Sequence, residues 1–182
     1  MRGAEAIVTK NNFLGRKAAV KNRIPKKYRN SGLDEKLRRS RTKVEARLLH
    51  RAKIAGVKCP VVLKVDDFSI TMTFIDGKRP GMNKKESWEA GKMLAKLHSA
   101  GIIHGDYTPA NLIESKGKFF VIDFGLGYFS DYTEDRAVDV YTMLRTLGEC
   151  GKKSFLKGYR TYKKYNSVFR RLEDIGKRVR YA

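Results

Sequence analysis

Cysteine, proline and long apolar runs are all scarce in this chain of 182 residues. Its two cysteines, Cys59 and Cys150, give neither a disulfide framework nor a zinc-site spacing, which favours a reducing location. No apolar run approaches the roughly 18 residues that a membrane-spanning helix requires. Residues 1–12 lack the apolar centre of a signal peptide. We therefore expect a cytoplasmic protein that does not act on a membrane.

Acidic residues are also few, and they are unevenly distributed. The chain has 19 Asp or Glu against 40 Lys or Arg, a formal net charge of +21. Residues 1–58 hold 18 basic and 4 acidic residues, and residues 152–182 hold 11 and 2. The intervening residues 59–151 hold 11 basic and 13 acidic residues. Solvated helix faces are one explanation of the basic ends, but this segregation favours a polyanionic partner and a separate task for the middle.

Hydrophobic residues make up 41% of the chain, enough for a folded core and too many for a disordered basic tail. The patterns predict a strand-rich first part with one long helix and a helix-rich second part, an α+β order. A linker near residues 76–83 divides them into an N-terminal lobe, 1–77, and a C-terminal lobe, 78–182, which ends in a basic tail. Strands are predicted over 6–9, 17–22, 60–65, 69–75 and 119–122, and helices over 31–55, 84–100, 135–148 and within 152–182.

The strongest chemical signal lies in two loop segments of the middle region. Asp106 follows His104-Gly105, and Asn111 comes five residues after Asp106. Asp123 follows twelve residues after Asn111 and begins the triplet Asp-Phe-Gly. Two carboxylates and an amide that converge on one cleft would form an oxygen-ligand site for Mg²⁺, the ion that bridges phosphates in phosphoryl transfer. Taken singly, either aspartate could instead be an ordinary residue that caps a turn.

The Asp-x₄-Asn spacing followed by Asp-Phe-Gly resembles the catalytic and metal-binding loops of protein kinases. This resemblance implies that Asp106 is the catalytic base and that Asn111 and Asp123 are Mg²⁺ ligands. A kinase-like site also needs a strand lysine that holds the ATP phosphates and a helix glutamate that holds this lysine. Lys21 follows a plausible strand, and Glu45 borders the buried stripe of the long predicted helix.

Two further features of the first half fit the same resemblance. A surface pairing with Arg41 is the alternative for Glu45, but a single inward carboxylate among many cations is best explained as the partner of a buried lysine. The adenine-holding hinge should fall at the end of the strand predicted over 69–75. The residues assigned to it are Met72, Thr73, Phe74 and Ile75.

The departures from ordinary protein kinases narrow the family. No Gly-x-Gly-x-x-Gly loop is present, and Gly3, Ala4 and Glu5 stand in its place as expected ATP-binding residues. Glycine replaces the arginine of the His-Arg-Asp triplet, and no Ala-Pro-Glu element follows Asp-Phe-Gly. Only 16 positions separate Asp123 from Asp139, which resembles the buried aspartate of the central kinase helix. We therefore expect no activation segment and no peptide-docking platform.

Together with the segments 20–29 and 41–47 and the basic tail, these motifs resemble the small atypical serine/threonine kinase of the KEOPS complex, in its short archaeal form. The resemblance implies a small two-lobed protein-kinase-like fold with a reduced C-lobe. It also implies binding of ATP and Mg²⁺, phosphorylation of serine or threonine, including autophosphorylation, and ATP hydrolysis. The implied partners are the threonylcarbamoyl-transferase subunit, the other KEOPS subunits and tRNA, in support of threonylcarbamoyladenosine formation.

The basic ends provide two candidate surfaces for tRNA or a protein partner. The first includes Lys26, Lys27 and Arg29, and the second includes Arg170, Arg171, Lys177, Arg178 and Arg180. Aromatic residues are interleaved with the second surface and could stack on unpaired bases, although packing is the commoner role of such residues in a terminal helix. The acidic face of a protein partner is the alternative to tRNA for the tail.

Three rival functions share parts of this pattern. A small-molecule kinase would use the same Asp106, Asn111 and Asp123, but a neutral substrate needs no strongly basic flanks. A RIO-type kinase is also short, but its phosphate and catalytic loops differ from those seen here. A non-catalytic RNA-binding scaffold should have lost Lys21 or one of the two aspartates, and the chain retains all three. A kinase core without a docking platform favours an ATPase-like switch over a broad signalling kinase.

Overall fold

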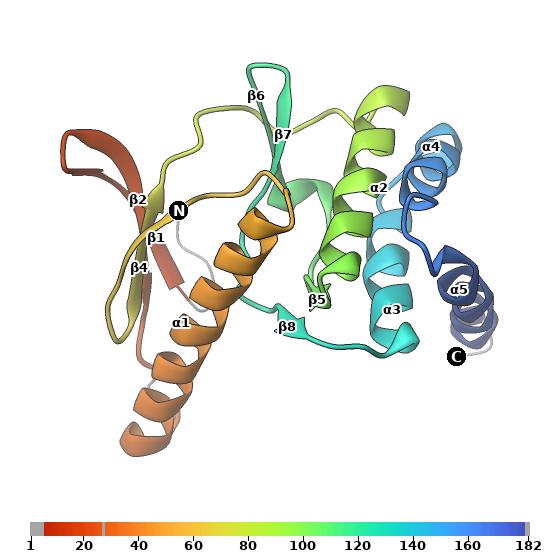
Figure 1. The fold of residues 1–182 in the computed structure, drawn as a ribbon. Coiled ribbons are helices and arrows are strands. Elements are labelled where there is room, and N and C mark those ends of the chain that lie inside the picture. The colour runs from red at the N-terminus through yellow and green to blue at the C-terminus, as the bar shows by residue number, and fades with distance from the viewer. Residues whose placement is uncertain (1–5, 27, 181–182) are drawn as a thin grey trace.

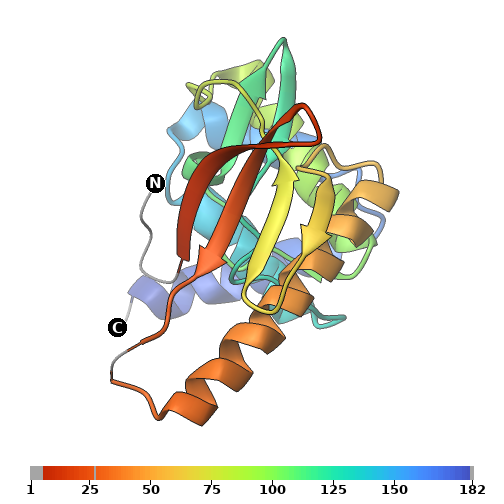
Figure 2. The ribbon, with the colours of Figure 1, turned by 90° about the vertical axis from the view of Figure 1, so that its left-hand side faces the viewer.

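The first half of the chain forms an antiparallel sheet with one long helix across it. A computed structural model describes residues 6–26 and 28–180, and of residues 178–180 it describes the backbone alone. The sheet order is β1-β2-β4-β3, and α1 crosses one face of the sheet (Figure 1, Figure 2). These elements are β1 (Ala6–Phe13), β2 (Arg16–Arg23), α1 (Ser31–Ile54), β3 (Val62–Val65) and β4 (Ser69–Thr73).

The hairpin of β1 and β2 is longer than the sequence pattern predicted. Its strands pair from Ala6 with Arg23 to Phe13 with Arg16, so both extend beyond the predicted ranges 6–9 and 17–22. Only Leu14 and Gly15 remain in the turn, with φ values of 50° and 75°. Positive φ at both central residues gives the twist that suits a two-residue hairpin connection.

Helix α1 is capped by the residue just before it. The side chain of Asn30 accepts hydrogen bonds from the amides of Gly32 and Leu33, so Asn30 is the N-cap and the helix begins at Ser31, as the sequence predicts. The helix buries Leu48 and Ala52 in the hydrophobic core. It also buries Glu45, whose carboxylate faces Lys21 and Arg23 of β2.

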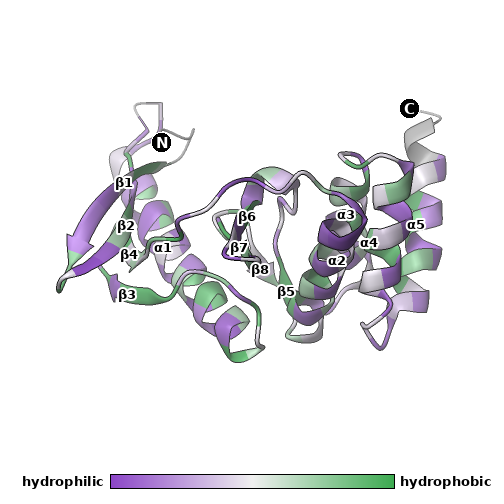
Figure 3. Cartoon of the chain, turned by 90° about the horizontal axis from the view of Figure 1, so that it is seen from above, coloured by the Kyte–Doolittle hydropathy of each residue, from purple (hydrophilic) through white to green (hydrophobic). Residues whose placement is uncertain are grey.

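The second half is mostly helical and contains two small two-stranded sheets, in which β5 pairs with β8 and β6 with β7. Figure 3 shows the four helices α2 to α5 at one end, the first sheet and α1 at the other, and the short strands between them. The elements are α2 (Lys84–Ser99), β5 (Ile102–Ile103), η1 (Pro109–Asn111), β6 (Leu112–Ser115), β7 (Lys118–Val121), β8 (Tyr128–Phe129), α3 (Thr133–Leu144), α4 (Glu149–Tyr159) and α5 (Tyr165–Arg180).

Helices α2 and α4 approach each other through glycine. A Cβ atom on Gly91 would lie 2.1 Å from the carbonyl oxygen of Phe155, and one on Gly158 would lie 2.1 Å from that of Trp88. Any larger residue would therefore force the two backbones apart. This close contact brings Tyr159, at the end of α4, to the buried side of α2.

The buried face of α3 is centred differently from the face that helical spacing predicts. Of the predicted positions Val138, Tyr141, Leu144 and Leu147, the last three lie in the core or pack against it, but Val138 is 46% exposed. Ala137, Val140 and Met143 are fully buried instead. The reason is Asp139, which is 1% exposed and turns inward because its carboxylate accepts hydrogen bonds from the loop that contains Asp106. A polar residue on the buried face shifts the apolar stripe away from the one that hydrophobicity alone indicates.

One hydrophobic cluster runs through both halves, from Leu48 and Met72 to Val168 and Ile175. The segment 74–83 joins β4 to α2 and is tied to the second half by a bridge between Lys78 and Glu114. Division of the chain into lobes at residues 77 and 78 stays a prediction. Among the described helices, none is long and apolar enough to cross a membrane.

Candidate active site

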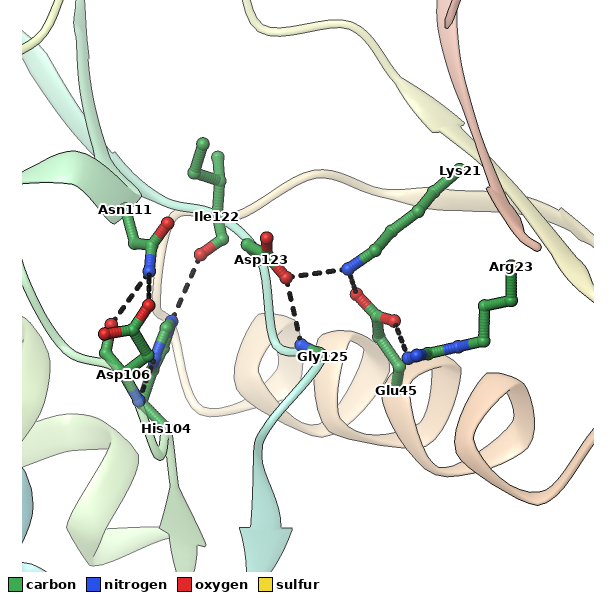
Figure 4. A network of polar contacts seen from close by, with 9 residues as sticks. All are labelled: Lys21, Arg23, Glu45, His104, Asp106, Asn111, Ile122, Asp123 and Gly125. Atoms are coloured by element: carbon green, nitrogen blue, oxygen red, sulfur yellow. Dashed lines mark hydrogen bonds and ion pairs between the residues drawn. The ribbon is translucent and has the colours of Figure 1, made fainter. Parts of the chain in front are cut away.

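A lysine and a glutamate from the first half meet an aspartate from the second (Figure 4). Lys21 Nζ, on β2, donates to Glu45 Oε1 of α1 at 2.6 Å and to Asp123 Oδ1 at 2.7 Å. Glu45 is 2% exposed and Lys21 is 7% exposed, so each needs an opposite charge to offset the loss of hydration. The structure therefore brings these three predicted site residues together.

Asp123 follows β7 in a left-handed backbone conformation, with φ at 61°. Few non-glycine residues adopt this region, and here it turns the carboxylate back toward the Gly125 amide, which donates to Oδ1 at 3.1 Å. Burial acts to raise the pKa of Asp123, but the charge and hydrogen bond of Lys21, with the Gly125 amide, hold that pKa below its usual range. The carboxylate is therefore ionised at neutral pH.

Asp106 and Asn111 form a second group beside the first (Figure 4). Asn111, at the end of η1, donates through Nδ2 to both the carbonyl oxygen and Oδ2 of Asp106, each at 2.8 Å. The five-residue spacing closes this loop because Pro109 begins the short helix with its φ already fixed. The Asn111 amide thus orients the Asp106 carboxylate, and its own oxygen points the other way.

Asp139 of α3 holds the backbone of the Asp106 loop through hydrogen bonds. The amides of His104 and Gly105 donate to the two carboxylate oxygens of Asp139 at 2.7 and 2.9 Å. Gly105 has φ at 77°, and a Cβ atom there would lie 2.4 Å from the Leu126 carbonyl oxygen. This contact explains why glycine stands where ordinary kinases carry the arginine of His-Arg-Asp.

His98, on the buried side of α2, links this anchor to α4. The Tyr159 hydroxyl lies 2.6 Å from His98 Nδ1, and Asp139 Oδ2 lies 3.3 Å from Nε2. Burial lowers the pKa of His98, more than Asp139 raises it, so the ring is neutral and its Nε2–H donates to the carboxylate. The sequence pattern of the helix predicted over 84–100 does not indicate these hydrogen bonds.

Glu45 has a second cationic partner that the sequence analysis missed. Arg23 Nη2 donates to Glu45 Oε2 at 2.5 Å, and the Arg23 side chain is 4% exposed. The available signal was the two-residue spacing from Lys21, because alternate residues of a strand point to the same face. In a segment so rich in lysine and arginine, this spacing alone did not single out Arg23.

The oxygen donors of the site suit Mg²⁺ better than a transition metal. Within the described residues, no group of three or more His, Cys, Asp or Glu side chains is arranged to hold a metal by itself. Asp123 Oδ2 and Asn111 Oδ1 form no hydrogen bond with another described residue. Mg²⁺ is commonly held by one or two such protein oxygens together with substrate phosphates and water. The donor set therefore fits Mg²⁺ that arrives with a nucleotide.

The predicted hinge residues lie at the end of β4 and just after it. Met72 is buried and pairs with Ala19 of β2. The Phe74 amide donates to the Lys17 carbonyl at 3.2 Å, and the Thr73 amide donates to the Val61 carbonyl at 2.9 Å. Thr73, Phe74 and Ile75 are half-buried, and Gly3, Ala4 and Glu5 lie outside the described residues.

The first basic surface is less available than its composition suggests. Arg29 and Arg38 both lie within ion-pair distance of Asp34, at 3.7 and 2.6 Å. The backbone amide of Lys26 donates to the same carboxylate at 3.2 Å. Lys27 lies outside the described residues. Arg29 and Arg38 therefore share one carboxylate within the chain.

The second basic surface lies on α5. Arg170 and Lys177 are exposed, whereas Arg171 forms an ion pair with Glu134 of α3. Arg178 and Arg180 fall within α5, and their side chains lie outside the described residues. The neighbouring aromatic residues pack inward, which is the commoner role of such residues in a terminal helix. Tyr159 and Tyr162 are buried, and Tyr165 and Phe169 contact the core cluster.

Comparison with known proteins places this geometry in a family. A family model described as the RIO domain matches residues 7–132. The probable serine/threonine-protein kinase BUD32 homolog of Archaeoglobus fulgidus is 42% identical, with 90% of this chain and 88% of that relative covered. The chain belongs to the RIO-domain family, among the BUD32 homologues. The predicted family is thus confirmed, and RIO-type kinases are its relatives rather than a separate alternative.

Longer relatives contain the same unit. The probable bifunctional tRNA threonylcarbamoyladenosine biosynthesis protein of Methanosarcina mazei is 40% identical over 99% of this chain and 35% of its own length. A protein of the same name from Methanobrevibacter smithii is 39% identical over 100% of this chain and 36% of its own. This RIO-domain chain therefore spans about a third of the length of these bifunctional relatives.

Solved structures confirm the predicted kinase-like fold. A Rio2 kinase complex with ADP/Mg²⁺ and phosphoaspartate from Chaetomium thermophilum has a TM-score of 0.69 at 16% identity, covering 96% of this chain and 69% of that one. The macrolide 2′-phosphotransferase MphH of Brachybacterium faecium also has a TM-score of 0.69, at 14% identity, covering 95% and 79%. The fold is therefore shared by kinases of different substrate classes and does not by itself select a substrate.

Proposed function

We propose that this chain is an atypical serine/threonine kinase and ATPase that acts with KEOPS subunits, in the cytoplasm, in threonylcarbamoyladenosine formation on tRNA. One observation carries the catalytic part: Lys21, Glu45 and Asp123 meet as one ionic group, with the Asp106–Asn111 pair beside it (Figure 4). The names of the Archaeoglobus and Methanosarcina relatives support the kinase activity and the tRNA pathway. A non-catalytic scaffold would have no need to retain this set.

The nucleotide is proposed to lie between the β1–β2–β4 sheet and the Asp123 loop. Because the Thr73 and Phe74 amides already donate to Val61 and Lys17, adenine would be read by the other backbone groups of residues 73–75. Met72 would close the back of the pocket. Lys21 Nζ would bind phosphate oxygens while Glu45 holds the lysine in position.

Asp123 and Asn111 would hold Mg²⁺ through the carboxylate and amide oxygens named above. When bound, Mg²⁺ offsets the charge that the phosphates develop during transfer. The depressed pKa of Asp123 keeps its carboxylate charged for this role. Asp106, oriented by Asn111 Nδ2, would accept the proton of the attacking hydroxyl or orient a water molecule.

The short connection after Asp123 favours particular phosphoryl acceptors. Residues 126–132 link the Asp-Phe-Gly triplet to α3 and contain only the two-residue strand β8. Such a segment offers little surface for a free peptide, so the chain would act on itself, on a tethered partner or on water. The isolated chain should accordingly turn over generic peptides poorly.

A comparison of two aspartate variants tests the proposed activity. Purified chain is incubated with labelled ATP and Mg²⁺, with and without tRNA and the transferase partner, and both label transfer and phosphate release are measured. Asp106→Asn should lower both by about 10²- to 10⁴-fold, as expected for loss of a general base. Asp66→Asn, which removes a surface carboxylate paired with Lys64, should not change either.

Two results would contradict the proposal in different ways. Absence of any ATP turnover by the unmodified chain with all partners present would rule out the kinase and ATPase function. Full turnover by Asp106→Asn would leave the function intact and exclude Asp106 as its base.

We propose that tRNA contacts include the exposed basic residues of α5. Arg170 and Lys177 are exposed, in contrast to the paired arginines near the start of α1. A protein that neutralises several phosphates loses affinity steeply with salt, and Arg170→Gln with Lys177→Gln should weaken tRNA binding at every salt concentration. The matched control is Lys84→Gln with Lys85→Gln, two exposed lysines at the start of α2.

Binding that is flat between low and physiological salt would contradict the tRNA contact. If the α5 variant instead weakens only the association with the transferase subunit, the tail is a protein interface.

A further inference from the structure

Arg23 is buried beside the proposed nucleotide site. It lies two residues after Lys21 on β2, so the two side chains point to the same face of the sheet. Lys21 binds Oε1 of Glu45 and Arg23 binds Oε2, at 2.6 and 2.5 Å. The single carboxylate of Glu45 is therefore held between two cations, both less than a tenth exposed.

These groups form an ordered row of alternating charge (Figure 4). Arg23 contacts Glu45, Glu45 contacts Lys21, and Lys21 contacts Asp123. A Cβ atom on Gly125 would lie 3.0 Å from Lys21 Nζ and 3.7 Å from Arg23 Nη2, so the loop after Asp123 rests against both cations. Asp123 is the half-exposed end of the row, and Arg23 is its buried end.

Nucleotide binding would disturb this row from the exposed end. In the proposed function Asp123 turns to Mg²⁺ and Lys21 is shared with phosphate oxygens, so Glu45 loses part of its compensating charge. An unpaired buried carboxylate is strongly unfavourable. A guanidinium stays charged at every accessible pH and binds carboxylate oxygens with fixed geometry. Arg23 can therefore keep compensating the negative charge of Glu45 when Lys21 shares its own charge with the phosphates.

The backbone of Arg23 is fixed independently of the nucleotide. Its amide donates to the Phe68 carbonyl at 2.9 Å, and its carbonyl accepts from Arg38 Nη1 at 3.4 Å. Arg38 is itself held by Asp34 at 2.6 Å and lies over the Phe68 ring. The buried end of the row therefore has a rigid support, in contrast to the end at Asp123.

We propose that Arg23 is a positioning residue for nucleotide binding, which keeps Glu45 in place while Lys21 is shared between Glu45 and the phosphates. This inference rests on the proposed function and deepens it, because it adds a second cation to the lysine–glutamate pair. The effect of Arg23 would be transmitted through its contact with Glu45 and the contact of Glu45 with Lys21.

Binding of a non-hydrolysable ATP analogue with Mg²⁺ tests the proposal, measured by calorimetry on the full chain. Arg23→Gln keeps a hydrogen-bond donor near Glu45 but removes the charge, and it should raise Kd about tenfold, corresponding to about 1.4 kcal/mol. Arg23→Lys restores the charge and should return Kd to within about threefold of the unmodified chain. Arg39→Gln, at a paired and partly exposed arginine of α1, is the matched control and should not change Kd.

The thermal stability of each variant is measured without nucleotide, to separate positioning from folding. If Arg23→Gln lowers the melting temperature but leaves Kd unchanged, Arg23 is only structural and the inference is overturned. If Arg23→Gln does not fold, Glu45→Gln and the double variant carry the test, because Arg23 should add nothing once its partner is neutral. A further loss in the double variant would overturn the inference. An unmodified chain that does not bind the analogue would overturn the proposed function as well.

Discussion

Glu45 and Asp139 are both buried carboxylates, 2% and 1% exposed, but their surroundings are of opposite kinds. Glu45 is held by the side chains of two cations, Lys21 and Arg23. Asp139 is held by two backbone amides and by His98, a ring that burial keeps neutral. The first group can exchange partners by side-chain rotation, whereas the second cannot do so without moving the backbone. We infer that Glu45 serves a site that changes with its ligand, and that Asp139 serves a loop that stays fixed.

Asp139→Asn should have the largest effect on stability. The neutral amide loses two charge-assisted hydrogen bonds, each worth about 1.5–3 kcal/mol, so the free energy of unfolding should fall by about 3 kcal/mol or more. Urea denaturation measures this change. Asp131→Asn, at a fully exposed aspartate near the start of the same helix, should stay within about 0.5 kcal/mol of the unmodified chain. An Asp139→Asn protein as stable as that control would remove the distinction between the two carboxylates.

Glu45→Gln should affect activity more than stability. Lys21 would keep its contact with Asp123 but lose the position that Glu45 imposes, and misplacement of a catalytic group by about 1 Å can cost about 100-fold in rate. We expect kcat/KM for ATP to fall by about that factor, with a smaller loss of unfolding free energy than in Asp139→Asn. Glu35→Gln, on the exposed side of α1, is the control. The reverse order of the two stability losses would contradict this comparison.

The pH dependence of stability should show that His98, the partner of Asp139, is neutral in the folded chain. Burial, reinforced by Arg136 and His104 and opposed by Asp139, lowers the pKa of His98 from its ordinary value of about 6.5. Below about pH 6.5, His98 therefore binds a proton in the unfolded chain but not in the folded chain. The free energy of unfolding must then fall as the pH falls. Between about pH 7.5 and 5.5, His98 should contribute a loss of about 1 kcal/mol.

Urea denaturation at the two pH values, with His98→Gln for comparison, tests that contribution. The variant should keep only the part of the pH dependence that comes from His104, whose pKa burial also lowers. An equal loss in both proteins would show that His98 is not the group that titrates.

The sequence predicted contacts between site residues where a structural pattern and the chemistry of phosphoryl transfer both select the same residue. The strand position of Lys21, the helix position of Glu45 and the spacing of Asp106 from Asn111 each predicted a contact that the structure contains. The hairpin strands and the helix boundaries were predicted within a few residues, because the periodicity of apolar residues and the glycines between the elements mark them in the sequence. The assigned roles of these residues in ATP and metal binding stay predictions.

The misses have a common physical cause, which is pairing between residues distant in sequence. Arg23 was not distinguished from its many basic neighbours, since only the folded position of Glu45 shows which cation points inward. Arg171 was expected to face a partner but pairs with Glu134, 37 positions away. The face of α3 was misjudged because Asp139 is buried by its bonds to the His104 and Gly105 amides, a contact that hydrophobicity does not record.

The central claim is that the half-exposed end of the charged row, Asp123, receives the metal that accompanies a nucleotide. The most direct test compares ATP-analogue binding with Mg²⁺ and with EDTA, for the unmodified chain and for Asp123→Asn. We predict that Mg²⁺ tightens binding by at least about tenfold in the unmodified chain and by much less in the variant. An Asp123→Asn chain that keeps the full Mg²⁺ enhancement would contradict the account.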